Sequence, residues 1–211
     1  MTEPIRILLA DDHAVVRAGI RQFLERAAGL RVVAEADDGD MARRLIAEKQ
    51  PDVAVLDIQM PRATGIEVAR WSRANYPLVG LLVLTAYDDD PYVAAALAAG
   101  ANGYVLKTAA PDAIVQAVRD VNEGRQVLDP SIRGRATARE MTYEPLSERE
   151  LEVLALAARG YTNKAISAQL FISDRTVQGH LAHIYAKLQA ATRTEAVTRA
   201  LSMGLLAAPD A

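Results

Sequence analysis

Three carboxylates follow directly on largely apolar runs of this chain. Asp57 comes after the run 53–56, and Asp11 and Asp12 come after the run 5–10. Acids gathered in one place repel one another and lose solvation, and a bound cation offsets both costs. Mg2+ suits hard oxygen ligands of this kind, because it keeps several waters and pairs well with phosphate oxygens. The three acids therefore predict a magnesium site around Asp57.

A hydroxyl and an ammonium group follow two further apolar runs. Thr85 comes after residues 79–84, and Lys107 comes after residues 104–106. Each residue alone could belong to a turn or a helix cap, and Asp12 could cap the helix that follows it. The joint pattern is more specific, because Pro61 and Gly65 also force a loop after Asp57. Acids, metal, hydroxyl and ammonium together predict a site where a carboxylate is phosphorylated, which is a switch.

The runs in front of these residues have the pattern of strands in a parallel α/β sheet. They are short and apolar, bounded by polar residues and followed by helix-like segments. Five such runs alternate with helix-like segments, and in the first segment Val16, Ile20 and Leu24 share one face, which predicts core positions. Ligands bind at the carboxyl ends of strands in such sheets. We therefore expect a five-stranded parallel sheet that gathers the polar residues at one edge.

The composition indicates a folded chain without a membrane segment. Its 211 residues allow one large domain or two small ones, and a hydrophobic fraction of 51% excludes disorder. No apolar run approaches the roughly 18 residues of a membrane helix, and no signal peptide is visible. The lack of cysteine excludes disulfides and thiolate zinc sites, and it fits the cytoplasmic location that we expect.

Charge is divided unequally along the chain. Residues 1–124 carry 13 Lys and Arg against 18 Asp and Glu, a net charge of −5, whereas residues 145–209 carry 7 against 5, a net charge of +2. The second part therefore tolerates a polyanion, and the first part does not attract one. Between them, residues 125–144 contain Pro130, Gly134 and four arginines without apolar periodicity. We expect an exposed linker at 125–144 between domains at 1–124 and 145–208.

The second domain has a wholly helical pattern. Ser147 and Glu150 have the spacing of a capping box, Gly160 stops the helix that they open, and Thr162 or Asn163 caps a short helix. Ser173 caps a longer helix, and a second capping box, Thr192-Arg193-Thr194-Glu195, opens the last one. A short helix, a tight turn and a longer helix with a polar outer face predict a helix-turn-helix, whose second helix enters the major groove of DNA.

Residues 5–123 resemble the receiver domain of two-component response regulators. The matching residues are Asp11-Asp12, Asp57-Ile58-Gln59-Met60-Pro61, Gly65, Thr85-Ala86, Gly100-Ala101 and Tyr104-Val105-Leu106-Lys107. The resemblance implies a flavodoxin-like, doubly wound fold and an aspartyl phosphate at Asp57. The chain departs from the family at Thr108, where many receivers have proline, so a bend or cis peptide there is not carried over.

The receiver resemblance also implies roles for the residues around Asp57. Mg2+ would be held by Asp12, Asp57 and the backbone carbonyl of Gln59, with Asp11 acting through water. Thr85 and Lys107 would hold the phosphoryl oxygens. Tyr104 would be the aromatic residue that moves with Thr85 when the switch changes state.

Residues 146–206 are similar to LuxR-type DNA-binding domains. The matching residues are Leu146-Ser147-Glu148-Arg149-Glu150, Val153-Leu154, Gly160, Asn163-Lys164, Ile166, Leu170, Ile172-Ser173, Thr176-Val177, His180, Lys187-Leu188, Arg193 and Ala196. The whole chain thus resembles a response regulator of the NarL/FixJ type. This resemblance implies a transcriptional regulator phosphorylated by a sensor histidine kinase. Phosphorylation would free the DNA-binding domain or promote a homodimer that spans two half-sites.

The outer face of the longer helix departs from the family. Many relatives carry lysine where this chain has Gln178 and Ala182, and a bulkier residue where it has Gly179. Glutamine can pair with adenine and alanine can pack on a thymine methyl. Gly179 either permits close approach to DNA or is merely tolerated, at a cost of about 1 kcal/mol relative to alanine.

Three further residues of the expected DNA-binding set are basic. Lys164, Arg175 and Lys187 are interpreted as phosphate contacts, which position the domain without reading sequence. Thr176 completes the expected DNA-binding set. His180 and His183 have no third ligand at a metal-like spacing, and we assign them no chemistry.

Two other classes of function remain open alternatives at this point. A phosphatase or phosphotransferase could use Asp57 as a nucleophile on external substrates, but the chain lacks an acid two residues after Asp57 and has no glycine-rich phosphate loop. A constitutive DNA-binding protein could use the first domain only as a dimerisation scaffold, and the intact acidic set argues against that. We therefore expect a regulator and not an enzyme.

Overall fold

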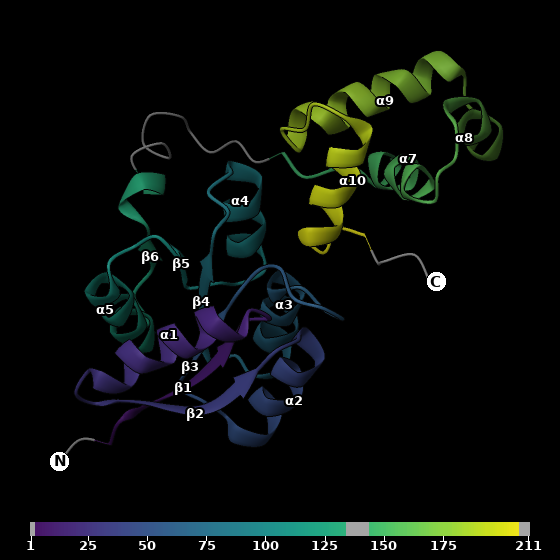
Figure 1. The fold of residues 1–211 in the computed structure, drawn as a ribbon. Coiled ribbons are helices and arrows are strands. Elements are labelled where there is room, and N and C mark those ends of the chain that lie inside the picture. Colours follow the sequence, from purple (N-terminus) through teal and green to yellow (C-terminus); the bar gives the residue numbers. More distant parts are fainter. Residues whose placement is uncertain (1–2, 134–143, 207–211) are drawn as a thin grey trace. The chain divides into compact units, whose positions relative to one another are not determined.

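The computed structural model describes residues 3–133 and 144–206, and the chain forms two compact units that divide after Met141 (Figure 1). Each unit is described by itself. Within the described residues, no helix is both long and apolar enough to cross a membrane.

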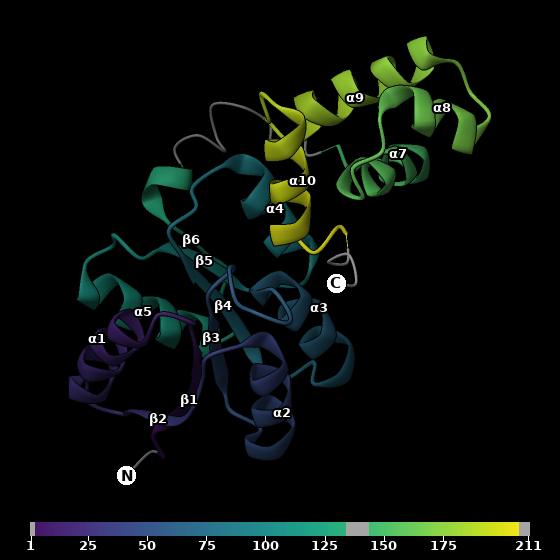
Figure 2. The ribbon, with the colours of Figure 1, turned by 45° about the vertical axis from the view of Figure 1, so that its right-hand side comes forward.

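The first unit is a parallel sheet covered by helices on both faces. Its strands are β1 (Ile5–Ala10), β2 (Leu30–Ala36), β3 (Val53–Leu56), β4 (Gly80–Thr85), β5 (Gly103–Leu106) and β6 (Val127–Leu128), in the order β2-β1-β3-β4-β5-β6. Its helices are α1 (Ala14–Arg26), α2 (Gly39–Lys49), α3 (Gly65–Asn75), α4 (Asp90–Ala98) and α5 (Pro111–Asn122). Helices α1 and α5 cover one face, while α2, α3 and α4 cover the other (Figure 2). The predicted doubly wound α/β sheet is confirmed.

The strands run through the core because helices cover both of their faces. All four residues of β3 are buried, as expected for a central strand of a parallel sheet. In the register of the ladder, Leu56 at the end of β3 pairs with Ala10 of β1 and Val83 of β4. The residues that follow β1 and β3 therefore emerge side by side at one edge. In α1, Ile20 and Leu24 are buried as predicted, whereas Val16 is exposed.

The sheet has one more strand than the sequence predicted. Val127 and Leu128 of β6 pair with Gly103 and Tyr104 of β5, and Asp129 N donates to Tyr104 O at 2.9 Å. Residues 130–133 are helical, and Ile132 is buried. Residues 125–133, which we expected to begin an exposed linker, thus extend the first unit. A two-residue strand leaves no periodicity in the sequence, and residues 134–143 of the expected linker lie outside the described residues.

The second unit consists of helices α7 (Glu148–Ala158), α8 (Asn163–Leu170), α9 (Asp174–Lys187) and α10 (Arg193–Ser202). Ser147 and Glu150 form both bonds of the predicted capping box. Thr162 and Ser173 cap α8 and α9, and Gly160, with a φ of +83°, follows the end of α7. The second predicted box is partly formed: Thr192 accepts from Glu195 N, while the Glu195 carboxylate accepts from Ala191 N.

The turn between α8 and α9 is tight and exposed. Phe171 ends α8 in the left-handed region with a φ of 54°, and its side chain is 95% exposed. Ile166 of α8 and Val177 of α9 are buried on the inner side of this turn. The arrangement of a short helix, a turn and a longer helix confirms the predicted helix-turn-helix.

Candidate functional site

Asp57, Asp11 and Lys107 meet at the carboxyl edge of the sheet. The register of β1 and β3 places Asp57 beside Asp11, and Asp57 N donates to Ala10 O at 2.9 Å. Both side chains are buried, with 4% and 1% of their residue surfaces exposed. The Lys107 ammonium lies 2.6 Å from Asp57 Oδ2 and 2.8 Å from Asp11 Oδ2. The structure therefore brings three of the predicted residues into direct contact.

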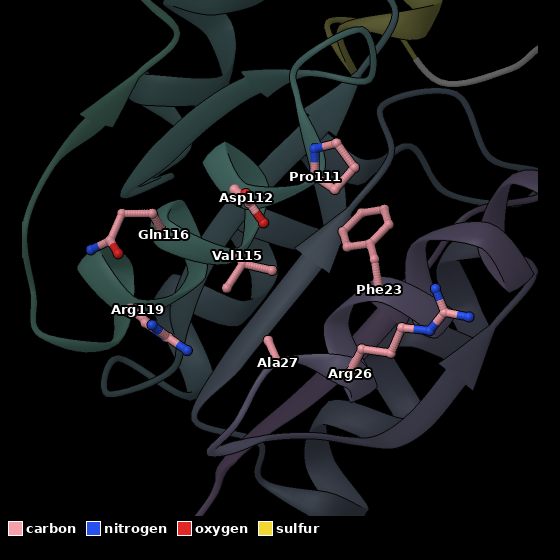
Figure 3. A pocket seen from close by; sticks show the side chains of 8 residues that line it. All are labelled: Phe23, Arg26, Ala27, Pro111, Asp112, Val115, Gln116 and Arg119. Carbon is pink, nitrogen blue, oxygen red and sulfur yellow. The ribbon is translucent and has the colours of Figure 1, made fainter.

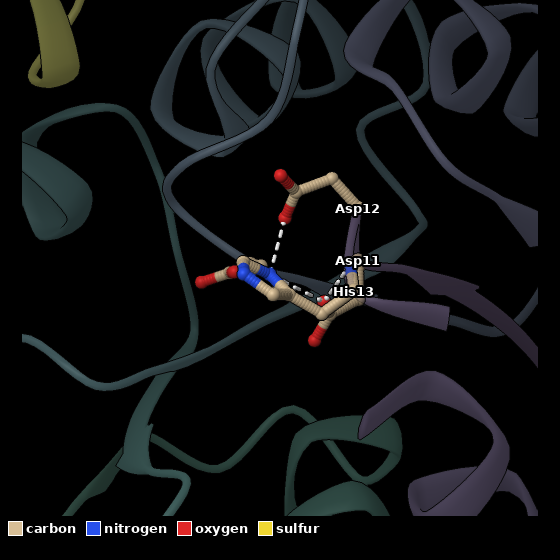
Figure 4. Close-up of side chains that lie close together, drawn as sticks. Asp11, Asp12 and His13 are labelled. Atoms are coloured by element: carbon tan, nitrogen blue, oxygen red, sulfur yellow. Dashed lines mark hydrogen bonds and ion pairs between the residues drawn. The ribbon is translucent and has the colours of Figure 1, made fainter. Parts of the chain in front are cut away.

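Asp12 joins this group through a residue that the sequence reasoning did not assign. Asp12 is exposed, and its Oδ1 lies 2.7 Å from His13 Nδ1, which is 3.6 Å from Asp11 Oδ1 (Figure 4). One ligand atom from each of Asp11, Asp12, His13 and Asp57 lies within 4.8 Å of the others. The only signal in the sequence for His13 was its place directly after two acids.

Burial and charge set the protonation of these groups. Burial raises the pKa of Asp57, the Lys107 ammonium acts against that rise, and the charge of Asp11 adds to it. Burial acts to lower the pKa of Lys107, but its bonds to Asp11 and Asp57 outweigh burial and leave that pKa above its usual value. A charged Lys107 pairs with the carboxylates of Asp11 and Asp57, and a carboxylate oxygen of Asp12 lies within 4.8 Å of ligand atoms of both acids. These hard oxygen donors, with more negative than positive charge, fit a divalent cation such as Mg2+.

Thr85 and Tyr104 share the backbone of Tyr87. Thr85 ends β4 and is fully buried, and its Oγ1 accepts from Tyr87 N at 3.4 Å. The Tyr104 hydroxyl donates to Tyr87 O at 2.7 Å, and burial keeps the pKa of Tyr104 well above its usual range. One peptide segment therefore connects the two residues predicted to switch together. Lys107 N donates to Thr85 O at 2.8 Å, which ties this pair to the acid group.

Gln59 lies exposed in the loop that follows Asp57.

Among the described residues, one cavity of about 430 Å3 lies between α1 and α5 and is lined by Phe23, Arg26, Val115 and their neighbours (Figure 3). None of the predicted site residues lines this cavity. The cavity therefore plays no part in the chemistry of Asp57.

The outer face of α9 carries four residues of the predicted DNA-binding set. Thr176, Gln178, Gly179 and Ala182 are all exposed. Apart from its chain neighbours and the backbone of α9 itself, a Cβ placed on Gly179 would have no described atom within 4 Å, so the fold does not require glycine there. The Thr176 hydroxyl pairs with Ser173 Oγ at 2.8 Å, at the start of α9. This face is therefore available and nearly uncharged.

Lys187, the third predicted phosphate contact, is held in ion pairs within the second unit. Its ammonium is 2.8 Å from Glu150 Oε2 and 3.1 Å from Glu144 Oε1, and its side chain is only 14% exposed. This ion pair fixes the end of α9 on the start of α7, so we withdraw Lys187 from the DNA-binding set. The sequence hid the pair because Glu150 lies 37 residues before Lys187. By contrast, Lys164 and Arg175 are exposed and have no ion pair within the described part of the chain.

Two family comparisons cover most of the chain. Residues 7–119 match the family described as response regulator receiver domain. Residues 144–200 match the family described as bacterial regulatory proteins, luxR family. The first match covers the sheet unit with Asp57, and the second covers the helix-turn-helix.

Relatives of known name align along almost the whole length. The chain is 37% identical over 203 residues to the transcriptional regulatory protein LiaR of Bacillus subtilis, covering 93% of this chain and 96% of LiaR. It is 34% identical over 222 residues to the transcriptional regulatory protein DegU of Brevibacillus brevis, covering 95% and 94%. It is also 37% identical to the oxygen regulatory protein NreC of Staphylococcus carnosus, covering 96% and 99%.

Solved structures give the same result. The response regulator ChrA of a heme-sensing two-component system is 42% identical, with a TM-score of 0.56 and coverage of 97% of this chain and 100% of ChrA. RcsB of Salmonella enterica serovar Typhimurium, bound to a promoter in the presence of a phosphomimetic, is 25% identical with a TM-score of 0.79, covering 95% and 99%.

The fold, the acid edge and the helix-turn-helix define a receiver joined to a DNA-binding domain, which is the architecture of a two-component transcriptional regulator. The chain belongs to the response regulators of the NarL/FixJ type.

Proposed function

We propose that this regulator is switched by transfer of a phosphoryl group from a sensor histidine kinase to Asp57. The observation that carries the proposal is the contact of the buried Asp57 carboxylate with Lys107, beside Asp11. A buried carboxylate costs desolvation free energy unless a nearby cation or hydrogen bonds offset that cost. Here the Lys107 ammonium lies beside Asp57, and ligand atoms of Asp11, Asp12 and Asp57 lie within 4.8 Å of one another.

Each residue of the site has a distinct task in this proposal. An Asp57 carboxylate oxygen attacks the phosphorus of the phosphohistidine, and the phosphorus–nitrogen bond breaks so that the imidazole leaves with its electron pair. Lys107 and the Thr85 hydroxyl hold the phosphoryl oxygens. Asp11, Asp12, Asp57 and the backbone carbonyl of Gln59 would hold Mg2+, with Asp11 acting through water. The cation supplies charge neutralisation at the phosphoryl oxygens when it is bound.

The signal would leave the site through Tyr87. Thr85 Oγ1 accepts from Tyr87 N, and Tyr104 OH donates to Tyr87 O, so a Thr85 hydroxyl that turns toward a phosphoryl group disturbs both bonds. Such a movement would change the surface formed by β4, β5 and their helices. We propose that this change controls homodimer formation and promoter binding.

On the DNA side, we propose that α9 enters the major groove. Thr176, Gln178, Gly179 and Ala182 would face the bases, while Lys164 and Arg175 would contact phosphates. RcsB, which is similar to this chain, has been solved bound to a promoter, and this supports DNA as the partner of the second unit. A homodimer would place two α9 helices on two half-sites.

The domain limits proposed here follow the contacts of residues 125–133. The receiver would extend through residue 133 instead of ending at 124, because β6 pairs with β5. The DNA-binding domain would occupy residues 145–208. We propose that the protein acts in the cytoplasm as a regulator and not as an enzyme on external substrates, in line with its transcriptional relatives.

The proposal is tested by labelling with a small phosphodonor such as acetyl phosphate in the presence and absence of Mg2+. The wild-type protein should gain an acid-labile phosphoryl group only with Mg2+, and Asp57→Asn, which is nearly isosteric, should keep its fold and lose the label. Promoter affinity should rise on phosphorylation of the wild type alone. Full labelling of Asp57→Asn would refute the assignment of Asp57. If phosphorylation leaves promoter affinity unchanged, the result would favour a constitutive DNA-binding protein whose first domain is only a dimerisation scaffold.

A further inference from the structure

The loop between β3 and α3 is closed onto Asp57 itself. Gly65 N donates to Ile58 O at 2.9 Å, and a Cβ on Gly65 would lie 2.0 Å from the carbonyl oxygen of Asp57. A real side chain cannot occupy that space, so glycine is required for this close approach. The loop of residues 58–64 therefore has its two ends fixed to each other. Gln59 lies within it, and its carbonyl belongs to the proposed metal site.

The middle of this loop rests on the start of α2. Gly39 N donates to Pro61 O at 3.1 Å. A Cβ on Gly39 would lie 2.0 Å from Ala63 O, so the helix backbone and the loop backbone lie in direct contact. Nothing in this contact involves the acid group. It fixes where the loop can lie relative to the sheet.

An ion pair holds the same two segments together. Asp38 is 2% exposed; its Oδ1 accepts from Met41 N at 2.8 Å and caps α2, while its Oδ2 lies 2.8 Å from Arg62 Nη2. Arg62 has a φ of 67°, a left-handed conformation that is unfavourable for a residue with a side chain. A surface ion pair contributes little on average. In this pair the Arg62 side chain is 65% exposed, but the Asp38 carboxylate is buried and the Arg62 backbone is held in a left-handed turn.

We infer that Asp38 and Arg62 are positioning residues of the phosphorylation site, which hold the loop of residues 58–64 so that the Gln59 carbonyl meets the bound cation. The inference rests on the proposed function. Partners that orient a metal ligand from outside typically change metal affinity by about 10–100-fold when they are removed. Asp38 and Arg62 would act in this way through the loop backbone, without contact to the cation.

The sign of the effect separates positioning from simple electrostatics. If the two residues acted only through their charges, loss of the Asp38 charge would weaken binding of a cation, and loss of the Arg62 charge would strengthen it. If they act by holding the loop, both losses weaken binding. The double variant should then resemble the single variants, because both remove one shared contact.

The experiment is a calorimetric titration of full-length protein with Mg2+. The variants are Asp38→Asn, Arg62→Asn and the double variant. Asparagine at 38 keeps an oxygen to cap α2, and asparagine at 62 tolerates the left-handed conformation. Asp40→Asn is the matched control, because Asp40 lies on the same first turn, is 57% exposed and pairs with Arg43 instead of the loop. Arg62→Asn leaves the cap of α2 intact, so it remains informative if Asp38→Asn unfolds.

We expect each single variant to raise the Kd for Mg2+ about tenfold, at the low end of the range for outer partners. The double variant should match them, and Asp40→Asn should stay close to wild type. With acetyl phosphate, the Mg2+ concentration for half-maximal phosphorylation should rise while the rate at saturating Mg2+ stays unchanged. If the wild-type protein binds Mg2+ but the Kd values of the two single variants shift in opposite directions or do not shift, the inference is wrong while the proposed function stands. A wild-type protein that binds no Mg2+ would instead refute the proposed function.

Discussion

In the receiver unit, Lys107 is in contact with both Asp57 and Asp11, whereas on the outer face of α9 Gln178 and Ala182 are exposed to solvent. The first group is arranged by strand ends whose register the sheet fixes. The second group is arranged by a single helix and needs a partner molecule to act. The function of a buried site can therefore be inferred from its internal contacts. An exposed site shows only which side chains are available to bind a partner.

The charged residues of the DNA-binding unit make the contrast more instructive. Lys187 pairs with Glu150, and Arg193 donates to Asn163 Oδ1 and Ala157 O, so both support the fold. Lys164 and Arg175 are the exposed cations that remain from the expected set. A basic residue in a DNA-binding domain is thus assigned to DNA only after its internal partners have been found.

The largest expected effect tests the internal contacts of the receiver. Lys107→Ala leaves Asp11 and Asp57 side by side without their cation, and the free energy of unfolding without Mg2+ should fall by about 3 kcal/mol. Saturating Mg2+ should restore most of that loss, since it neutralises the same acids. Urea unfolding followed by the fluorescence of Trp71, the single tryptophan of the chain and part of α3, reports on this unit.

Lys49→Ala removes an exposed lysine and is the control for this measurement. It should change the free energy of unfolding by less than about 0.5 kcal/mol. An equal loss for Lys107→Ala with and without Mg2+ would mean that the lysine supports the receiver by packing and not by charge.

On the exposed side of the comparison, Gln178→Ala should cost about 1–3 kcal/mol of binding free energy at one base pair and flatten the preference there. The reason is that the face around Gln178 offers one amide and otherwise small side chains. Binding to a set of operators with single substitutions measures the effect. If every sequence weakened equally and the preference survived, α9 would dock in another way.

A smaller effect separates the two kinds of lysine. Lys164→Gln should weaken binding to all DNA sequences alike and reduce the slope of log affinity against log salt by about one. Lys187→Gln should leave that slope unchanged and lower the melting temperature of the second unit, because Glu150 loses its partner. If Lys187→Gln reduces the salt slope as Lys164→Gln does, Lys187 also contacts DNA and the distinction between the two lysines is wrong.

The smallest effect is confined to acid. Burial acts to raise the pKa of Glu150, but Lys187 and the Ser147 backbone and hydroxyl outweigh it and hold that pKa below its usual value of 4.5. The stability that Glu150 contributes is therefore fully present above about pH 4.5 and is lost as the pH falls through the lowered value. In Glu150→Gln, the free energy of unfolding of the helical unit should fall less steeply as the pH drops below about 4.5. If the free energy of unfolding of Glu150→Gln depends on pH as that of the wild type does, other acids cause the pH dependence.

The sheet and its polar edge were predictable because their signals are local. Each predicted strand is an apolar run, and Asp57, Thr85 and Lys107 stand directly behind one. The helix-turn-helix was predictable for the same reason, since Ser147, Thr162 and Ser173 cap their helices through neighbours three residues away.

What escaped prediction depends on contacts between distant segments. The pairing of β6 uses backbone groups and leaves no side-chain pattern in two residues. The Asp38–Arg62 pair spans two loops, and the Lys187–Glu150 pair joins two helices, so neither spacing carries a signal. Val16 was expected in the core on helical periodicity, but it lies at the exposed start of α1.

The sheet also ends in a way that affects its behaviour at high concentration. Its last strand, β6, is two residues long, and Pro130, which has no backbone N–H, follows two residues after Leu128. An edge strand with a long row of unpaired amides is a template for aggregation, and short strands and prolines remove that template. This edge of the receiver is therefore closed to strand addition from a neighbouring molecule.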